Sequence, residues 1–212
     1  MRAALIDYGS GNIASAAKAL SRAASETSGH EIVVTADPDL VRKSERIILP
    51  GVGAFADCMR GLGAIPGMVE ALNESVIQNG KPILGICVGM QLMATAGREF
   101  GIHKGLNWIG GEVLPMLPVD PTLKIPHMGW NEIEPVQSHP LFAGLDANAN
   151  AYFVHSFEMK PDSAAHLLAT TSYGGPVTAA IGRDNIVGTQ FHPEKSQGVG
   201  LKILANFLNW KP

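Results

Sequence analysis

The chain has 212 residues and a formal net charge of −3, and 46% of its residues are hydrophobic against 17% charged. This composition is typical of a folded globular protein and excludes a disordered, collagen-like or low-complexity chain. The 16 basic and 19 acidic residues leave no basic excess, so neither nucleic acid nor an anionic membrane is expected as a partner. At roughly 150 residues per domain, one domain over residues 1–212 is favoured.

No segment resembles a signal peptide or a membrane span. Asp7 interrupts the first apolar run too early for the core of a signal peptide. Of two longer uncharged stretches, residues 82–97 are short for a bilayer span, and residues 163–182 are broken by Gly174-Gly175-Pro176. We therefore expect a cytoplasmic protein.

The first half of the chain alternates strand-like and helical patterns. Short apolar runs predict strands at residues 3–6, 31–35, 46–49 and 82–86, and helical patterns occupy residues 13–24, 65–79 and 88–97. This alternation predicts an α/β fold with a doubly wound, mostly parallel sheet and helices on both faces. Because ligands of such sheets bind at the carboxyl ends of the strands, we expect the functional residues there.

In the second half, Pro, Gly, Asn and Asp separate short strand candidates. These fall at residues 113–117, 131–134, 152–157, 165–171, 178–182 and 186–190, and an amphipathic helix is predicted over residues 198–210. Gly182-Arg183-Asp184-Asn185 is a plausible turn between two of them. We expect an antiparallel extension of the sheet within the same domain, since no break in composition marks a linker.

Cys87 lies between two glycines where a predicted strand passes into a helix. In Gly85-Ile86-Cys87-Val88-Gly89 the glycines have the offsets of the G-x-S-x-G nucleophile elbow. Such a turn strains the backbone of the nucleophile and needs small neighbours, and the start of a helix favours a thiolate. We predict a nucleophilic Cys87, with a buried packing residue as the alternative. For Cys58, within a helical pattern, packing is the preferred interpretation.

A thiolate nucleophile needs a group that handles protons. The candidates by residue type are His30, His103, His127, His139, His155, His166 and His192. We favour His192 because, in Phe191-His192-Pro193-Glu194, an extended backbone would place His192 and Glu194 on the same side. Glu194 could then orient the imidazole, as the acid does in a Ser-His-Asp triad.

Pro50-Gly51-Val52-Gly53 follows the third predicted strand, beside the elbow strand in a doubly wound order. Its glycines free backbone amides to bind a developing oxyanion, although an ordinary strand-to-helix turn would have the same pattern. The Cys87 thiol, the His192–Glu194 pair and this oxyanion site together indicate acyl transfer. No metal site is expected, because the cysteines are far apart and no His-x-x-x-His pair accompanies them. No cofactor is expected either.

Two segments resemble the signature segments of the class I (triad) glutamine amidotransferases. They are Gly85-Ile86-Cys87-Val88-Gly89-Met90-Gln91-Leu92 and Phe191-His192-Pro193-Glu194-Lys195-Ser196. Residues 7–12, 49–55, 126–131 and 152–156 extend the resemblance over essentially the whole chain. The resemblance implies a flavodoxin-like fold and hydrolysis of glutamine to glutamate and ammonia through a Cys87 thioester.

The resemblance also implies residue roles, with Cys87 as nucleophile, His192 as general base and acid, and Glu194 as its orienter. Backbone amides would form an oxyanion hole, drawn from Val88, Gly51, Val52 and Gly53. A further group would help to hold L-glutamine, namely Gln91 and the backbone of Val154, His155 and Ser156.

A partner is implied as well: a separate (β/α)8-barrel cyclase subunit, which would form a heterodimer with this chain and receive its ammonia. Free ammonia at neutral pH is mostly protonated and no longer nucleophilic, and 212 residues leave no room for a synthase domain. Loop residues near the active end are expected at the interface, namely Asn12, Trp130, Tyr152 and Lys195. A flexible Gly51-Val52-Gly53 would permit a peptide movement, triggered by the partner's ligand, that completes the oxyanion hole.

Two other functions fit part of the pattern. Gly9-Ser10-Gly11-Asn12-Ile13-Ala14 mimics a dinucleotide-binding fingerprint, with Asp37 as a possible ribose ligand, but an oxidoreductase leaves the cysteine elbow unexplained. A glutaminase-like subunit that binds a partner without catalysis is the second alternative. The three filled triad positions argue against it.

Overall fold

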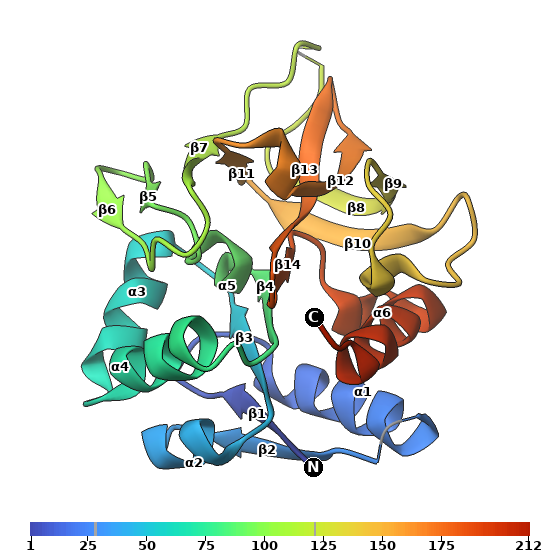
Figure 1. Ribbon diagram of the computed structural model, residues 1–212. Coiled ribbons are helices and arrows are strands. Elements are labelled where there is room, and N and C mark those ends of the chain that lie inside the picture. The colour runs from blue at the N-terminus through green and yellow to red at the C-terminus, as the bar shows by residue number, and fades with distance from the viewer. Residues whose placement is uncertain (28, 121) are drawn as a thin grey trace.

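The computed structural model describes residues 1–27, 29–120 and 122–212. Its centre is an eight-stranded sheet in the order β2-β1-β3-β4-β14-β13-β12-β9 (Figure 1). The strands from the first half are β1 (Arg2–Ile6), β2 (Glu31–Thr35), β3 (Arg46–Gly51) and β4 (Ile83–Cys87). They pair in parallel, and the chain steps from β1 outward in both directions. The predicted doubly wound sheet is confirmed.

Helices cover both faces of the sheet (Figure 1). One face carries α1 (Ile13–Glu26) and α6 (Gln197–Asn209), which pack on each other, and the other carries α2 (Pro38–Lys43), α3 (Phe55–Ala64) and α4 (Met68–Asn73). The apolar stripe predicted between residues 13 and 24 is the buried face of α1, and α6 confirms the predicted C-terminal helix.

Two expectations for the helices of the first half need correction. The helix predicted over residues 65–79 begins only at Met68, because Gly67 adopts a left-handed conformation with φ 77°, and it ends in a π-helical turn over Glu74–Gln78. The sequence pattern also missed α2, whose first turn is capped by Asp37 through a 2.8 Å bond from the Asp39 amide. Asp37, considered above as a ribose ligand, therefore has a structural role.

The helix predicted over residues 88–97 is wrong beyond its first turn. The helix α5 covers only Val88–Gln91, and β5 (Ala96–Gly97) is extended. The carbonyl oxygens of Leu92, Met93 and Ala94 accept hydrogen bonds from amides in residues 106–109. Contacts with this later segment replace the helical hydrogen bonds.

Half of the central sheet comes from the second half of the chain, as β9 (Glu134–Pro135), β12 (Leu167–Ser172), β13 (Pro176–Arg183) and β14 (Ile186–Thr189). The β12–β13 and β13–β14 pairs are antiparallel, as expected, and Arg183 pairs with Ile186 across the predicted turn. However, β14 pairs in parallel with β4, so the expectation of antiparallel strands fails at this junction. The parallel register brings the carboxyl ends of β4 and β14 to the same edge.

The remaining strands form two smaller sheets instead of extending the main one. One pairs β8 (His127–Glu132) with β10 (Asn150–His155), and the other contains β11 (Phe157–Pro161), β7 (Gly111–Pro115), β5 and β6 (His103–Lys104). The strand predicted over residues 152–157 is thus divided at Ser156 between two sheets. In the described part of the chain, no helix is long and apolar enough to cross a membrane.

Candidate active site

Cys87 lies at the carboxyl end of β4, immediately before α5, and its backbone is strained. It has φ 54° and ψ −113°, a region that L side chains rarely occupy and that stores strain at functional sites. A Cβ atom added to Gly85 would lie 2.7 Å from the Met90 backbone, and one on Gly89 would lie 1.8 Å from the Leu49 carbonyl oxygen. The flanking glycines are therefore required by close packing around the turn.

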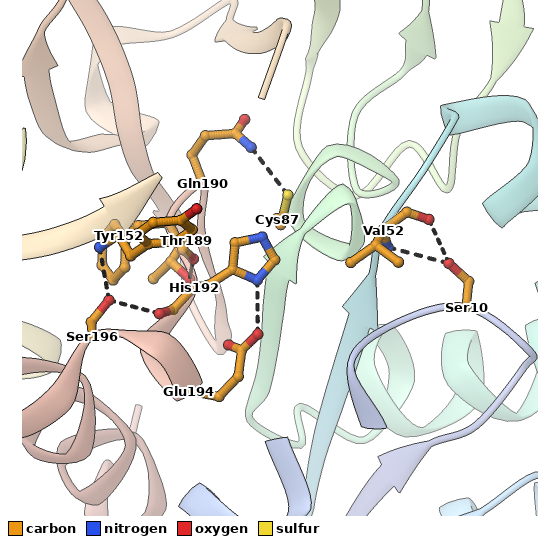
Figure 2. A network of polar contacts seen from close by, with 10 residues as sticks. Ser10, Val52, Cys87, Tyr152, Thr189, Gln190, His192, Glu194 and Ser196 are labelled. Atoms are coloured by element: carbon orange, nitrogen blue, oxygen red, sulfur yellow. Dashed lines mark hydrogen bonds and ion pairs between the residues drawn. The ribbon is translucent and has the colours of Figure 1, made fainter. Parts of the chain in front are cut away.

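His192 and Glu194 approach this cysteine from the end of β14 (Figure 2). The imidazole Nδ1 lies 2.8 Å from Glu194 Oε1, and both side chains are almost fully buried. Because a carboxylate only accepts, Nδ1–H donates to it and Nε2 is left for Cys87. The backbone differs from the expected extended segment, since Glu194 lies in a 3-10 turn over Pro193–Lys195.

The environment of His192 favours its charged form. Burial alone would lower its pKa, because desolvation disfavours an imidazolium, but hydrogen bonds to Cys87 and Glu194 and attraction to both groups raise the pKa to about 10. At neutral pH His192 is therefore an imidazolium, a cation that lies beside the sulfur.

Two glutamine side chains complete the surroundings of the sulfur. Gln190 Nε2 lies 3.6 Å from Cys87 Sγ, and Gln91 Nε2 donates to Gln190 Oε1 at 3.0 Å and to the Phe157 carbonyl at 3.1 Å. Sequence reasoning selected Gln91 but missed Gln190. Its signal was a polar residue closing an apolar strand, directly before Phe191-His192.

The Val52 amide, expected in the oxyanion hole, points elsewhere. It donates to Ser10 Oγ at 3.2 Å, and that hydroxyl donates to the Val52 carbonyl at 2.7 Å. In Figure 2 both contacts are directed away from Cys87. Of the neighbouring glycines, Gly51 faces Gly89, because a Cβ atom added to Gly51 would lie 2.6 Å from the Gly89 nitrogen. Gly53 has a φ angle of 88°.

The cleft in front of Cys87 has a volume of about 870 Å³, within the range of small-molecule sites. Most of the residues expected to act on glutamine line it: Val52, Gly53, Cys87, Val88, Gln91, Val154, His155, Ser156 and His192. Gly51 and Glu194 are not among the residues that line it. Glu99, Phe100 and Phe157 also line the cleft and were not anticipated.

Of the residues expected at a partner interface, Trp130 and Tyr152 lie in the strands β8 and β10 instead of in loops, and the other two line the mouth of the cleft. Asn12 and Lys195 line it, and the Lys195 ammonium lies 5.6 Å from the centre of the Tyr152 ring. Tyr152 pairs across the β8–β10 ribbon with Trp130, their ring centres 6.2 Å apart. Trp130 is 50% exposed and Met128 on the same strand is 62% exposed, so an apolar surface borders the site.

A buried pair of histidines supports the strand that lines the cleft. His155 Nδ1 donates to the Phe157 carbonyl at 2.9 Å, so its Nε2 must accept from His127 Nδ1 at 3.1 Å. Burial lowers the pKa of each of these histidines to about 4. His155 is therefore neutral at neutral pH, unlike His192.

The remaining candidates have structural surroundings. Cys58 is buried, as expected, with its sulfur 3.1 Å from Ser10 Oγ, and burial raises the pKa of its thiol. Gly11, part of the dinucleotide-like motif, lies close to Pro50, because a Cβ atom added to Gly11 would be 3.0 Å from the Pro50 Cβ. Among the described residues, no group of three or more His, Cys, Asp and Glu side chains could hold a metal ion.

Comparison with known proteins gives one family model and three relatives that agree with one another. The family model described as "Glutamine amidotransferase class-I" matches residues 4–210. A relative named imidazole glycerol phosphate synthase subunit HisH, from Rhodospirillum rubrum, is 58% identical over the full length of both chains. Proteins of the same name from Brucella suis (57% identical, full length of both) and Caulobacter vibrioides (58% identical, 99% of this chain and 98% of the relative) agree.

Solved structures are similar at the level of the fold. A putative GMP synthase protein from Thermoplasma acidophilum has a TM-score of 0.68 at 20% identity, with 98% of this chain and 92% of that chain covered. A glutamine amidotransferase from Thermotoga maritima has a TM-score of 0.63 at 16% identity, with 92% and 76% covered. The fold is thus one that solved glutamine amidotransferases share.

Proposed function

Because the chain belongs to the family of class I glutamine amidotransferases, we propose that it is the glutaminase subunit of an imidazole glycerol phosphate synthase in histidine biosynthesis. Residues 1–212 act as one glutaminase domain that hydrolyses L-glutamine to glutamate and ammonia. The observation that carries the proposal is the meeting of Cys87 and His192 in the lining of the cleft, with Glu194 bonded to the far side of the imidazole.

Acylation begins when the Cys87 thiolate attacks the side-chain amide carbon of glutamine. The C=O electron pair moves onto oxygen, and the Val88 amide, free at the start of α5, binds this oxyanion. The C–N bond then breaks while His192 Nε2–H protonates the departing nitrogen. Ammonia and a glutamyl thioester result.

Deacylation uses the same residues in reverse roles. His192 Nε2, now neutral, takes a proton from water as the oxygen attacks the thioester carbon. The C–S bond breaks, sulfur retains the electron pair, and glutamate leaves. Throughout, Glu194 holds Nδ1–H and stabilises the imidazolium, which its 2.8 Å contact with the buried ring supports.

The partner is a (β/α)8-barrel cyclase that receives the ammonia and forms imidazole glycerol phosphate and an aminoimidazole carboxamide ribotide. Two features support docking over the cleft. Trp130 and Met128 expose apolar surface beside it, and Asn12 and Lys195 supply polar groups at its mouth. A covered cleft would keep ammonia away from water, where it becomes protonated.

The oxyanion hole is half-formed in the isolated chain, and docking of the liganded cyclase completes it. The bonds between Val52 and Ser10 support this step, because they commit the Val52 amide to the hydroxyl. Rotation of the Gly51–Val52 peptide would turn that amide toward the substrate oxygen. Gly51 and Gly53 on either side allow such a rotation.

An isotope experiment tests the whole proposal. The chain is mixed with its cognate cyclase, the phosphoribosyl-formimino ribonucleotide and glutamine carrying nitrogen-15 in its side-chain amide. The label should enter the imidazole product, and excess unlabelled ammonium in the buffer should not dilute it. A product without label, or no complex on size-exclusion chromatography, would refute the assignment.

A further inference from the structure

Gln190 touches the nucleophile but has no place in the triad. It follows β14 directly, and because Thr189 pairs with Ile86 in parallel register, the next residues of both strands, Gln190 and Cys87, emerge side by side. The Gln190 side chain is wholly buried, and its Nε2 lies 3.6 Å from Cys87 Sγ (Figure 2).

The orientation of the Gln190 amide follows from its neighbours. The Phe157 carbonyl can only accept, so it fixes the nitrogen of Gln91, which is 3.1 Å away. That nitrogen also donates to Gln190 Oε1 at 3.0 Å. Since the oxygen of Gln190 faces Gln91, its nitrogen must face the sulfur.

Burial of the Gln190 side-chain amide would be unfavourable if its polar groups made no hydrogen bonds. Removing an amide from water is costly unless its groups find hydrogen-bond partners, and an apolar side chain would fill the same space without that cost. Among the described residues, Cys87 Sγ is the only hydrogen-bond partner of the Gln190 side-chain NH₂.

We propose that Gln190 is a catalytic residue that donates a hydrogen bond from Nε2 to Cys87 Sγ and stabilises the thiolate. Before attack, the thiolate accepts from both His192 and Gln190. During deacylation, the C–S bond breaks, the electron pair stays on sulfur, and Gln190 stabilises the returning charge. This second role rests on the proposed glutaminase reaction, whereas the first concerns the free chain.

Alkylation by iodoacetamide tests the first role, because only the thiolate reacts at an appreciable rate. The rate is followed at the Cys87 peptide by mass spectrometry across a pH series, so Cys58 does not interfere. In Gln190→Met the thiol–thiolate equilibrium should shift about tenfold toward the thiol, the effect expected when a hydrogen bond to a charged group is lost. The pH at which alkylation reaches half of its maximal rate should therefore rise, and Gln190→Glu should raise it further through repulsion. The matched surface change Gln78→Glu should have no effect.

If the alkylation rate of Cys87 depended on pH in the same way in wild type and in both folded Gln190 variants, the proposal would be overturned. Should these variants not fold, the wild type provides a second test. The side-chain amide proton of Gln190, observed by NMR, should shift strongly between wild type and Cys87→Ala, and an unchanged resonance would refute the contact. Neither readout needs glutamine or the cyclase, so a failure here is distinct from a failure of the glutaminase assignment.

Discussion

The Ser10 hydroxyl holds Val52 on both sides of its Cα, accepting from its amide at 3.2 Å and donating to its carbonyl at 2.7 Å. The Cys58 thiol reaches the same carbonyl at 3.3 Å. The Val52 amide, expected in an oxyanion hole, is thus held by Ser10 and directed away from Cys87.

Ser10→Ala is expected to raise the glutaminase activity of the isolated chain. The bond from the Val52 amide to Ser10 Oγ, an ordinary hydrogen bond of about 1 kcal/mol, is the one that restrains this amide, and its loss should ease the rotation and increase kcat about fivefold. Ser10→Thr, which keeps the hydroxyl, should resemble wild type. The measurement is kcat for glutamate release without cyclase. A fall in kcat for Ser10→Ala would mean that the bond supports activity instead of restraining it.

Glu194→Gln should lower kcat by about 10³–10⁴-fold with a much smaller effect on KM, because a neutral amide cannot stabilise the imidazolium and its NH₂ can donate to Nδ1, which selects the wrong tautomer. The Glu194 contact lies behind His192 and not in the cleft, so glutamine binding is largely retained. Steady-state kinetics of the complex provide the measurement. A variant with nearly normal kcat would remove Glu194 from the mechanism.

His192 should make folding stability fall at alkaline pH. Its pKa is about 10 in the folded chain against an ordinary 6.5, so the folded state binds the proton more tightly than the unfolded state. This stabilisation is complete below about pH 6.5 and is lost as the pH rises through about 10. Urea unfolding between these values should show the decline. Cys87→Ala, which removes one partner of the imidazolium, should flatten the curve, and an unchanged slope would contradict this.

The His127–His155 pair should make folding stability fall at acid pH, whereas His192 makes it fall at alkaline pH. Burial lowers the pKa of both to about 4, so the unfolded state binds protons first and stability is lost as the pH falls from about 6.5 toward 4. His127→Gln should reduce this loss. His103→Gln, a change at a half-buried position, serves as control. If wild type and His127→Gln lost the same stability as the pH falls, the claim that the two buried histidines are neutral in the folded chain would be refuted.

Trp130→Ala should weaken binding of the cyclase at least tenfold, since a large aromatic side chain at the centre of an interface is a frequent hot spot. The control is Ile77→Ala, an equally exposed apolar residue in the turn before β4, at the opposite edge of the sheet. Isothermal titration calorimetry measures both affinities. Equal losses in the two variants would argue against docking at the β8–β10 ribbon.

Local patterns allowed much of the fold to be predicted. The strand over Glu31–Thr35 has the predicted bounds, and the glycines around Cys87 indicated the turn that the structure contains. Where hydrogen bonds come from distant segments, the pattern failed. The helix after Cys87 ends early because residues 106–109 take its carbonyl groups, which no local periodicity records.

The candidate site shows the same division. His192 and Glu194 are two residues apart, so their pairing could be inferred from the chain itself. Gln190 meets Cys87 across 103 positions, and Ser10 meets Val52 across 42. Contacts of this kind depend on the parallel register of the sheet, which the sequence pattern suggests only in outline.

Glutamate release from L-glutamine is the measurement that tests the central claim most directly. It is compared for the chain alone, with the cognate cyclase, and with cyclase plus its ribonucleotide, each in wild type and Cys87→Ala. We expect release to be slow alone, fastest in the complete mixture and absent in every Cys87→Ala sample. Equal rates in the three wild-type mixtures would contradict partner control, and release that survives the loss of Cys87 would contradict the thioester mechanism.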